Sequence, residues 1–214
     1  MNEKLTELVF ILDRSGSMAG MVEDTIGGFN SMLNKQRGEE GECLLSTIMF
    51  STSSQVVHDR ADIKNVPELT KQDYIPGGCT ALLDAIGDAI HHIGNVHKYA
   101  RNEDRPAHTL FVITTDGMEN ASRRYSAEKV KQMIERQKSK YGWEFLFLGA
   151  NIDSLHTAEG IGIDADYAAN FHNDSCGQEV NYRAVECAVS DVRRRGFVRR
   201  KEWREEIDKD YYSR

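Results

Sequence analysis

The sequence predicts a single α/β domain in which a doubly wound, mostly parallel sheet carries one antiparallel edge strand. Apolar strand-length segments alternate with helical patterns along the chain, as expected of a parallel sheet covered by helices. The first of these segments, residues 7–12, lacks polar alternation, which is typical of a central strand buried on both faces. Two later segments are joined only by residues 51–54, a connection so short that it permits only an antiparallel pair.

The elements of the first half follow from periodicity and spacing. After the strand at 7–12, a helix is expected over residues 21–35 because its apolar side chains repeat on one face. These side chains are Val22, Ile26, Phe29 and Leu33. The antiparallel strands are expected at 43–50 and 55–63. A long apolar-faced helix beginning at Thr80 comes next, followed by a strand at 109–114.

The second half continues the alternation. Ser126 is expected to cap a helix that Gly142 ends, because serine accepts hydrogen bonds from first-turn N–H groups and glycine tolerates the left-handed conformation beyond the last turn. A strand follows at 143–148. The next region is rich in loops, with a short helix near 154–159 and a weak final strand over 167–171.

The last helix of the domain is expected to open at Ser175-Cys-Gly-Gln178, which has the form of a capping box. We assign residues 1–196 to the domain and 197–214 to a charged carboxyl-terminal tail or helix. The tail places three large side chains four residues apart: Trp203, Ile207 and Tyr211. The sequence leaves three interpretations open: a helix that docks on another protein, a segment that folds back on its own domain, or a frayed terminus.

Composition restricts the class of protein. The chain has 214 residues, 40% hydrophobic and 29% charged, which is typical of one globular domain rather than a disordered chain. Its 34 acidic and 27 basic residues give a net charge of −7, so no nucleic-acid partner is expected, because phosphate backbones attract basic surfaces. We find no signal-peptide pattern and no apolar run near the roughly 18 residues of a membrane span. We therefore expect a cytoplasmic protein without membrane association.

The four cysteines are widely scattered along the chain: Cys43, Cys79, Cys176 and Cys187. They form no Cys-x-x-Cys pair, so neither a zinc knuckle nor a disulfide framework is indicated. We expect them to be reduced packing residues, with Cys79 as a small apolar plug.

A candidate cation site follows the first strand. Asp13, Ser15 and Ser17 place one carboxylate and two hydroxyls at alternate positions, and alternate side chains of an extended segment point the same way. Mg²⁺ takes oxygen ligands and usually keeps several waters, so a site with few carboxylates and some hydroxyls suits it. The sequence therefore predicts a loop that holds a hard cation.

Two distant segments add to this loop. Thr80 follows Gly77-Gly78-Cys79 at the expected start of a helix, and Asp116 follows the strand at 109–114. In open α/β sheets, ligands bind beyond the carboxyl ends of the strands. We therefore expect Thr80 and Asp116 to lie beside the Asp13 loop.

The three segments together resemble the metal-ion-dependent adhesion site (MIDAS) of von Willebrand factor A (VWA) domains, whose pattern is Asp-x-Ser-x-Ser, a separate Thr and a separate Asp-Gly. The resemblance covers about residues 5–196. It implies a Rossmann-like VWA fold of a bacterial cytoplasmic type and a bound Mg²⁺, with Mn²⁺ or Ca²⁺ as alternatives. The implied ligands are Asp13, Ser15, Ser17, Thr80 and Asp116. The resemblance also implies a protein partner that supplies a Glu or Asp carboxylate, with an ATPase or a stress-response assembly as candidates.

An enzyme is the competing interpretation. A strand-end aspartate with magnesium also describes aspartyl phosphotransferases and phosphatases of the haloacid dehalogenase type, which usually carry a second carboxylate two residues after the nucleophile. Here that position is Ser15, which cannot act as a general acid in the same way. We therefore expect a magnesium-dependent protein-interaction module without enzymatic activity, and keep the phosphotransferase as the alternative.

Overall fold

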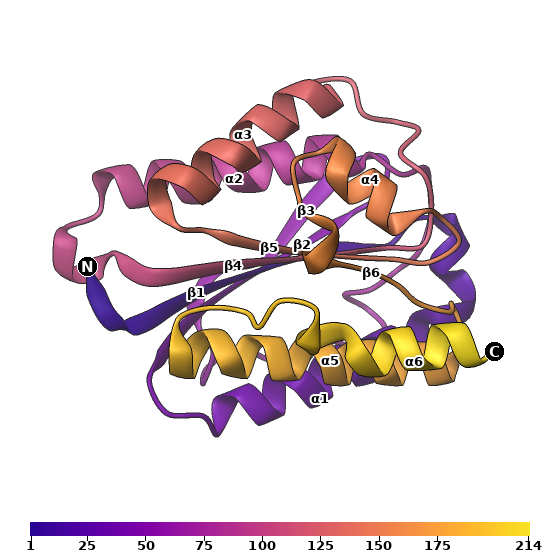
Figure 1. Ribbon diagram of the computed structural model, residues 1–214, viewed down its shortest axis with the longest axis horizontal. Helices are drawn as coiled ribbons and strands as arrows, with labels where there is room; N and C mark the ends of the chain where they lie inside the picture. Colours follow the sequence, from indigo (N-terminus) through magenta and orange to yellow (C-terminus); the bar gives the residue numbers. More distant parts are fainter.

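The computed structural model describes residues 1–214 and contains one six-stranded sheet in the order β3-β2-β1-β4-β5-β6 (Figure 1). The strands are β1 (Asn2–Asp13), β2 (Glu42–Phe50), β3 (Ser54–Asp62), β4 (Pro106–Thr115), β5 (Glu144–Gly149) and β6 (Ala168–Asn170). All neighbouring strands are parallel except β2 and β3, which are antiparallel. The predicted fold class, including the antiparallel edge strand, is confirmed.

Helices cover both faces of the sheet. They are α1 (Val22–Arg37), α2 (Leu82–Tyr99), α3 (Ala127–Tyr141), α4 (Ser154–Gly160), α5 (Ser175–Arg195) and α6 (Glu205–Ser213). Short 3₁₀ segments occur at Gly16–Met21, Asn102–Asp104, Ala165–Tyr167 and Glu202–Arg204. Figure 1 shows α1, α5 and α6 on one face, and α2, α3 and α4 on the other. No helix combines the length and the apolar character that a membrane crossing requires.

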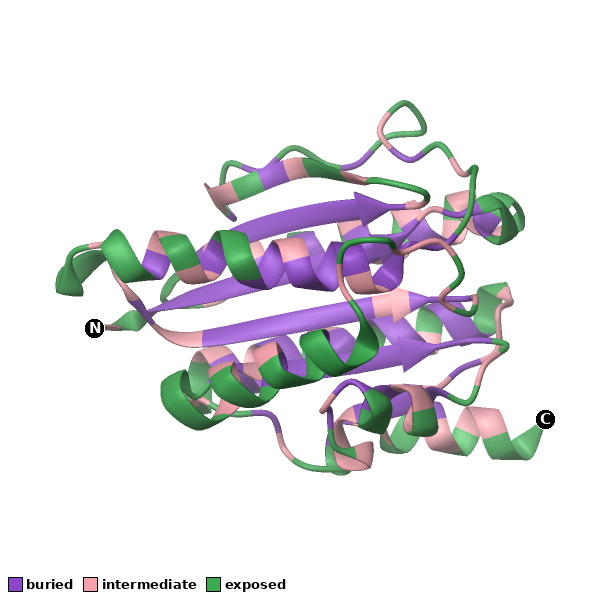
Figure 2. Cartoon of the chain, turned by 90° about the horizontal axis from the view of Figure 1, so that it is seen from above, coloured by how far each residue is buried: buried purple, intermediate pink, exposed green.

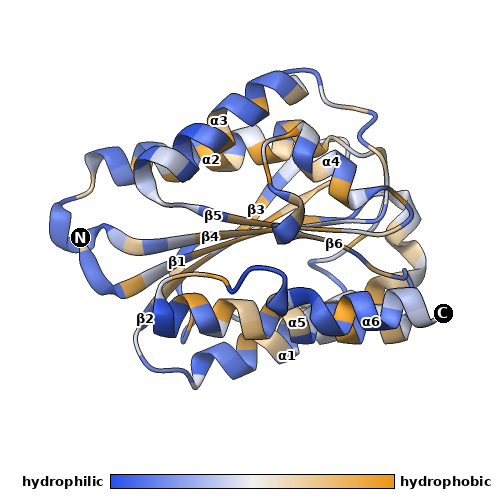
Figure 3. Ribbon diagram, viewed as in Figure 1, coloured by the Kyte–Doolittle hydropathy of each residue, from blue (hydrophilic) through white to orange (hydrophobic).

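The central strand β1 divides the core into two parts. Leu8, Phe10 and Leu12 pack with α1 and α5, whereas Val9 and Ile11 pack with α2 and α3. Successive side chains of a strand point to opposite faces, so a continuous apolar run fills both layers. Figure 2 shows the inner strands largely buried, and the edge strand β3 and the outer sides of the helices largely exposed or half-buried. Figure 3 shows hydrophobic residues concentrated in the sheet and on the helix sides that face it.

Two helix starts differ from the prediction. A 3₁₀ turn leads into α1, and α2 begins at Leu82, so Thr80 lies in the preceding loop. The capping box at Ser175 is wrong: Asp174 is the N-cap of α5 and accepts a hydrogen bond from Gly177 N at 2.8 Å. Aspartate is as strong an N-cap as serine, and Ser175 Oγ instead donates to Asp24 on α1 at 2.9 Å.

The carboxyl-terminal segment folds back on its own domain. Trp203 and Ile207 are buried in the core cluster that α1 and α5 form with the sheet. Trp203 Nε1 donates to the carbonyl of Asp166 at 3.0 Å, which fixes the segment beside β6. Two of the three spaced side chains therefore serve the core of this chain.

Candidate metal centre

The site lies where the chain reverses its direction across the sheet. β1 and β4 are parallel neighbours whose register pairs Leu12 with Thr114, so Asp13 and Thr115 end the two strands side by side. The helix after β1 covers one face, and the helix after β4 covers the other (Figure 1). Such a switch point leaves a crevice at the carboxyl edge of the sheet, where ligands bind in this class of fold.

Asp13 is held from three directions at the end of β1. Its Oδ1 accepts from the backbone N of Ser15 at 2.7 Å, and its Oδ2 accepts from Thr115 Oγ1 at 2.6 Å. The hydroxyl of Tyr74 donates to its backbone carbonyl. With 2% of its surface exposed, Asp13 has a fixed position beneath the loop that follows it.

A chain of hydrogen bonds joins the first loop to Asp116. Ser15 Oγ and Ser17 Oγ lie 3.0 Å apart, and Ser17 Oγ donates to Asp116 Oδ1 at 2.6 Å across 99 residues of sequence. Ser15 and Asp116 are buried, whereas Ser17 is exposed. The crevice therefore opens to the surface on the side of Ser17.

Thr80 lies against the same crevice. Its backbone N donates to Asn120 Oδ1 at 2.9 Å, and its carbonyl accepts from Asn120 N at 3.0 Å. A Cβ placed on Gly117 would lie 3.5 Å from Thr80 Oγ1 and 3.9 Å from Ser17 Oγ. The hydroxyls of Thr80 and Ser17 thus both lie near Gly117, and the structure brings together all five predicted side chains.

The electrostatics of the site require a countercharge. Burial raises the pKa of Asp13, and the nearby charge of Asp116 adds to this shift. Burial also raises the pKa of Asp116, and hydrogen bonds from Ser17 and Asn173 oppose it. No cationic side chain contributes to either shift. Two buried carboxylates without a cation are costly, and a divalent ion would balance both charges.

The donor set fits a hard cation. The structure has no group of three or more His, Cys, Asp or Glu side chains arranged to hold a metal ion. The oxygens at the crevice come instead from two carboxylates and three hydroxyls, and oxygen-only coordination is what Mg²⁺ and Ca²⁺ prefer.

Several residues of the site escaped sequence analysis. Thr115 donates to the Asp13 carboxylate, whereas Asn120 and Tyr74 hold the backbone of Thr80 and of Asp13. Asn173 Nδ2 donates to Asp116 Oδ2 at 3.0 Å. Thr115 could have been inferred because it ends the strand beside Asp116. No sequence signal links Asn120 or Asn173 to the site.

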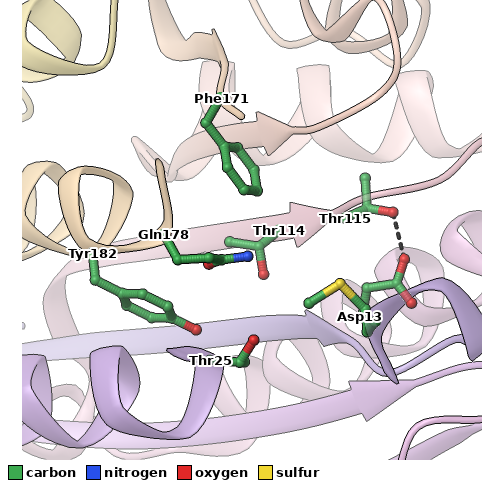
Figure 4. A pocket seen from close by; sticks show the side chains of 8 residues that line it. Asp13, Thr25, Thr114, Thr115, Phe171, Gln178 and Tyr182 are labelled. Carbon is green, nitrogen blue, oxygen red and sulfur yellow. Dashed lines mark hydrogen bonds between the residues drawn. The ribbon is translucent and has the colours of Figure 1, made fainter. Parts of the chain in front are cut away.

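A small cavity lies beneath Asp13. It measures about 10 Å³ and is lined by Asp13, Met18, Thr25, Thr114, Thr115, Phe171, Gln178 and Tyr182. Figure 4 shows these side chains and the hydrogen bond between Thr115 and Asp13. Because one water needs roughly 10–15 Å³, the cavity can hold no larger ligand.

The expectation for Cys79 is wrong. Cys79 is exposed, as are Cys176 and Cys187, and only Cys43 is a buried packing residue. The backbone N of Cys79 donates to Thr52 Oγ1 at 3.0 Å. Cys79 lies in the loop before α2, and its side chain reaches solvent.

Comparison with known proteins rests on structure alone. No family model and no curated protein matches the chain. The pilus adhesin SpaC from Lactobacillus rhamnosus GG, in its open conformation, superposes with a TM-score of 0.67 at 12% identity, over 89% of this chain and 30% of that one. A von Willebrand factor type A protein from Catenulispora acidiphila superposes with a TM-score of 0.57 at 12% identity, over 88% of this chain and 43% of that one.

A third similar structure is proximal thread matrix protein 1 from the mussel byssus with a zinc-occupied MIDAS motif. Its TM-score is 0.60 at 14% identity, over 86% of this chain and 48% of that one. The chain thus spans less than half the length of each of these three proteins. At such identities the similarity establishes the fold alone, and this chain has the single-domain α/β fold of VWA domains.

Proposed function

We propose that this chain is a magnesium-dependent protein-interaction module that binds a carboxylate of a protein partner. The ligands are Asp13, Ser15, Ser17, Thr80 and Asp116. The observation that carries the proposal is the pair of buried carboxylates that no cation of the chain compensates, beside three hydroxyls at one crevice. Mn²⁺ or Ca²⁺ are the alternative ions for such an oxygen set.

The five side chains have different roles at the crevice. When bound, the ion supplies an electrophilic centre whose remaining position a partner's Glu or Asp oxygen takes. Asp13 and Asp116 balance its charge, and the hydroxyls of the two serines and Thr80 add neutral, weak donors. Because the chain provides only two carboxylates, a third one from a partner is electrostatically acceptable.

The surface around the crevice supports a protein as the partner. Ile75 and Met118 are 64% and 73% exposed, and they lie on the loops that lead to Thr80 and follow Asp116. Exposed apolar side chains beside a polar centre are typical of protein interfaces. The similarity to a pilus adhesin and to a MIDAS-containing matrix protein supports the same choice. An ATPase or a stress-response assembly remains the candidate partner.

A pulldown with the whole chain tests the proposal. Bait is exposed to a lysate of the source cell in Mg²⁺ or in a chelator, using wild type, Asp13→Asn and the control Asp104→Asn, which changes an exposed aspartate before β4. We expect a partner that is retained only with Mg²⁺, by wild type and the control but not by Asp13→Asn. Retention that ignores both Mg²⁺ and Asp13→Asn would contradict the proposal.

A further inference from the structure

Asn173 reaches the candidate metal centre from an element that carries none of the five predicted ligands. It lies between β6 and α5, 57 residues after Asp116, and its Nδ2 donates to Asp116 Oδ2 at 3.0 Å. The other carboxylate oxygen, Oδ1, accepts from Ser17 Oγ at 2.6 Å. Each oxygen of Asp116 thus has one side-chain donor, and the two donors together fix the rotation of the carboxylate.

The orientation of the Asn173 amide is itself fixed. Gln178 Nε2, on the first turn of α5, donates to Asn173 Oδ1 at 3.2 Å. Gln178 is buried, and its side chain lines the cavity beneath Asp13 (Figure 4). Since an ionised carboxylate only accepts hydrogen bonds, the Asn173 NH₂ group must face Asp116 while its carbonyl faces Gln178.

The residues on either side of Asn173 are attached to the carboxyl-terminal helix. The ring of His172 stacks on Tyr211 with centroids 4.8 Å apart, and its Nε2 lies 3.2 Å from the Tyr211 carbonyl. Asp174 accepts from Arg214 NH1 at 2.7 Å while it caps α5. The backbone of Asn173 is therefore held on both sides, which fixes its side-chain amide beside Asp116.

We propose that Asn173 is a positioning residue of the metal centre and that Gln178 holds it in place. This inference rests on the proposed magnesium function. Asn173 orients Asp116 so that Oδ1 faces Ser17 and the crevice, which prepares the carboxylate for the ion before it binds. Groups that orient metal ligands typically change metal affinity by about 10- to 100-fold when they are removed.

Titration calorimetry with Mg²⁺ on the full chain tests the inference. For Asn173→Ala we expect a Kd about 10-fold weaker than wild type, together with a lower unfolding midpoint in chelator, because the buried Gln178 amide loses its acceptor. Asn173→Asp has the same shape but cannot donate to Asp116. It should lower the unfolding midpoint in chelator, because two carboxylates then face each other, and should enlarge the shift caused by Mg²⁺.

Asn151→Gly is the matched control. Asn151 is an asparagine on the same rim, but its Nδ2 points to the backbone carbonyl of Asp116 and not to the carboxylate. Its φ of 58° suits glycine, so the substitution removes the side chain without backbone strain. We expect this variant to keep the wild-type Kd for Mg²⁺.

The outcomes separate this inference from the proposed function. If wild type binds Mg²⁺ and Asn173→Ala binds it equally well, the positioning role is wrong while the metal site stands. If wild type binds no Mg²⁺, both are wrong. Should Asn173→Ala fail to fold, Gln178→Met replaces it in the test, because it removes only the donor to Asn173. An unchanged Kd in that variant would also overturn the inference.

Discussion

The middle and the carboxyl end of β1 each bury a carboxylate, but the surroundings of the two carboxylates differ. Glu7, in the middle of the strand, is fully buried, and its Oε2 lies 2.9 Å from Arg60 NH2 and 3.1 Å from His97 Nε2. Asp13, at the carboxyl end, is almost as buried, yet its carboxylate accepts only from a hydroxyl and a backbone N–H. Glu7, the framework acid, has its countercharge in the chain, whereas Asp13, the acid at the crevice, has no cationic partner in the chain.

The backbone around Glu7 shows how strongly this pairing is enforced. Arg60 lies at an irregular point of the β2–β3 pairing with φ at 46°, a conformation that non-glycine residues rarely adopt and that costs about 1–3 kcal/mol. Ser46 Oγ accepts from the backbone N of Arg60 at 3.0 Å and supports this geometry. No comparable arrangement brings a cation to Asp13.

Breaking the ion pair between Glu7 and Arg60 should have the largest effect on stability. Glu7→Gln leaves Arg60 without its anion in a mostly buried place, so we expect a loss of about 3–5 kcal/mol in the free energy of unfolding. The loss should be the same in Mg²⁺ and in chelator. Urea denaturation measures it, with the exposed Glu42→Gln as a control that should stay within about 0.5 kcal/mol of wild type. A loss under 1 kcal/mol would remove the contrast between the two acids.

Asp13→Asn tests the second acid of the comparison, at the carboxyl end of β1. At 100 times its Kd, Mg²⁺ should stabilise wild type by about 2.7 kcal/mol through linkage, and the variant should lose this gain. In chelator the variant should be at least as stable as wild type, because it removes an uncompensated buried charge. Thermal unfolding with and without Mg²⁺ measures both. A loss in chelator as large as that of Glu7→Gln would mean that Asp13 is a framework acid.

Glu144, a half-buried acid at the start of β5, gives an intermediate case. Burial raises the pKa of Glu144 from 4.5 to about 7, opposed by the hydrogen bond from the backbone N of Val198. Between these two values the native state keeps a proton that the unfolded state has released, so stability falls as pH rises. Glu144→Gln should therefore have a larger free energy of unfolding than wild type above pH ~7, and the two proteins should be equally stable near pH ~4. Because the side chain is partly exposed, we expect a gain of about 1 kcal/mol.

Urea denaturation across this pH range measures the effect of Glu144→Gln. The glutamine keeps an oxygen that can accept from Val198, so the comparison isolates the charge. A difference between the two proteins that does not change with pH would show that Glu144 carries no unusual proton.

The last prediction is that the chain does not hydrolyse small phosphoesters. If Asp13 serves to hold an ion and not as a nucleophile, small phosphoesters should not be hydrolysed in the presence of Mg²⁺. The residue two positions on, Ser15, has its hydroxyl beside Ser17 and offers no acid. A phosphatase assay with wild type and Asp13→Asn decides this. Magnesium-dependent turnover that Asp13→Asn abolishes would favour the haloacid dehalogenase alternative.

Most of the fold was accessible from sequence because residues 8–12 of β1 form a continuous apolar run and the connection at 51–54 is short. Helix packing was less accessible. Gly27 and Gly28 look equivalent in sequence, yet a Cβ on Gly28 would lie 2.1 Å from Tyr182 on α5, and a Cβ on Gly27 would meet nothing within 4 Å. That difference depends on which helix lies beside α1, which local patterns do not contain.

In the site, too, some residues could be predicted from local sequence and others depend on how the helices pack. Asp13, Ser15 and Ser17 form a local pattern, and Thr80 and Asp116 follow from the ends of predicted elements. Asn173 and Gln178 could not be inferred, because they follow a three-residue strand and their role depends on how α5 and α6 pack. The capping box was wrong for the same reason: Arg214, at the end of α6, holds Asp174 where it caps α5.

The most direct test of the metal centre is anomalous diffraction from crystals of the whole chain soaked in Mn²⁺, which replaces Mg²⁺ in oxygen sites. We expect one strong peak in the crevice between the Ser15–Ser17 loop, Thr80 and Asp116, absent from crystals of Asp13→Asn. A crevice without a peak at saturating Mn²⁺, or a peak bound elsewhere on the chain, would contradict the assignment.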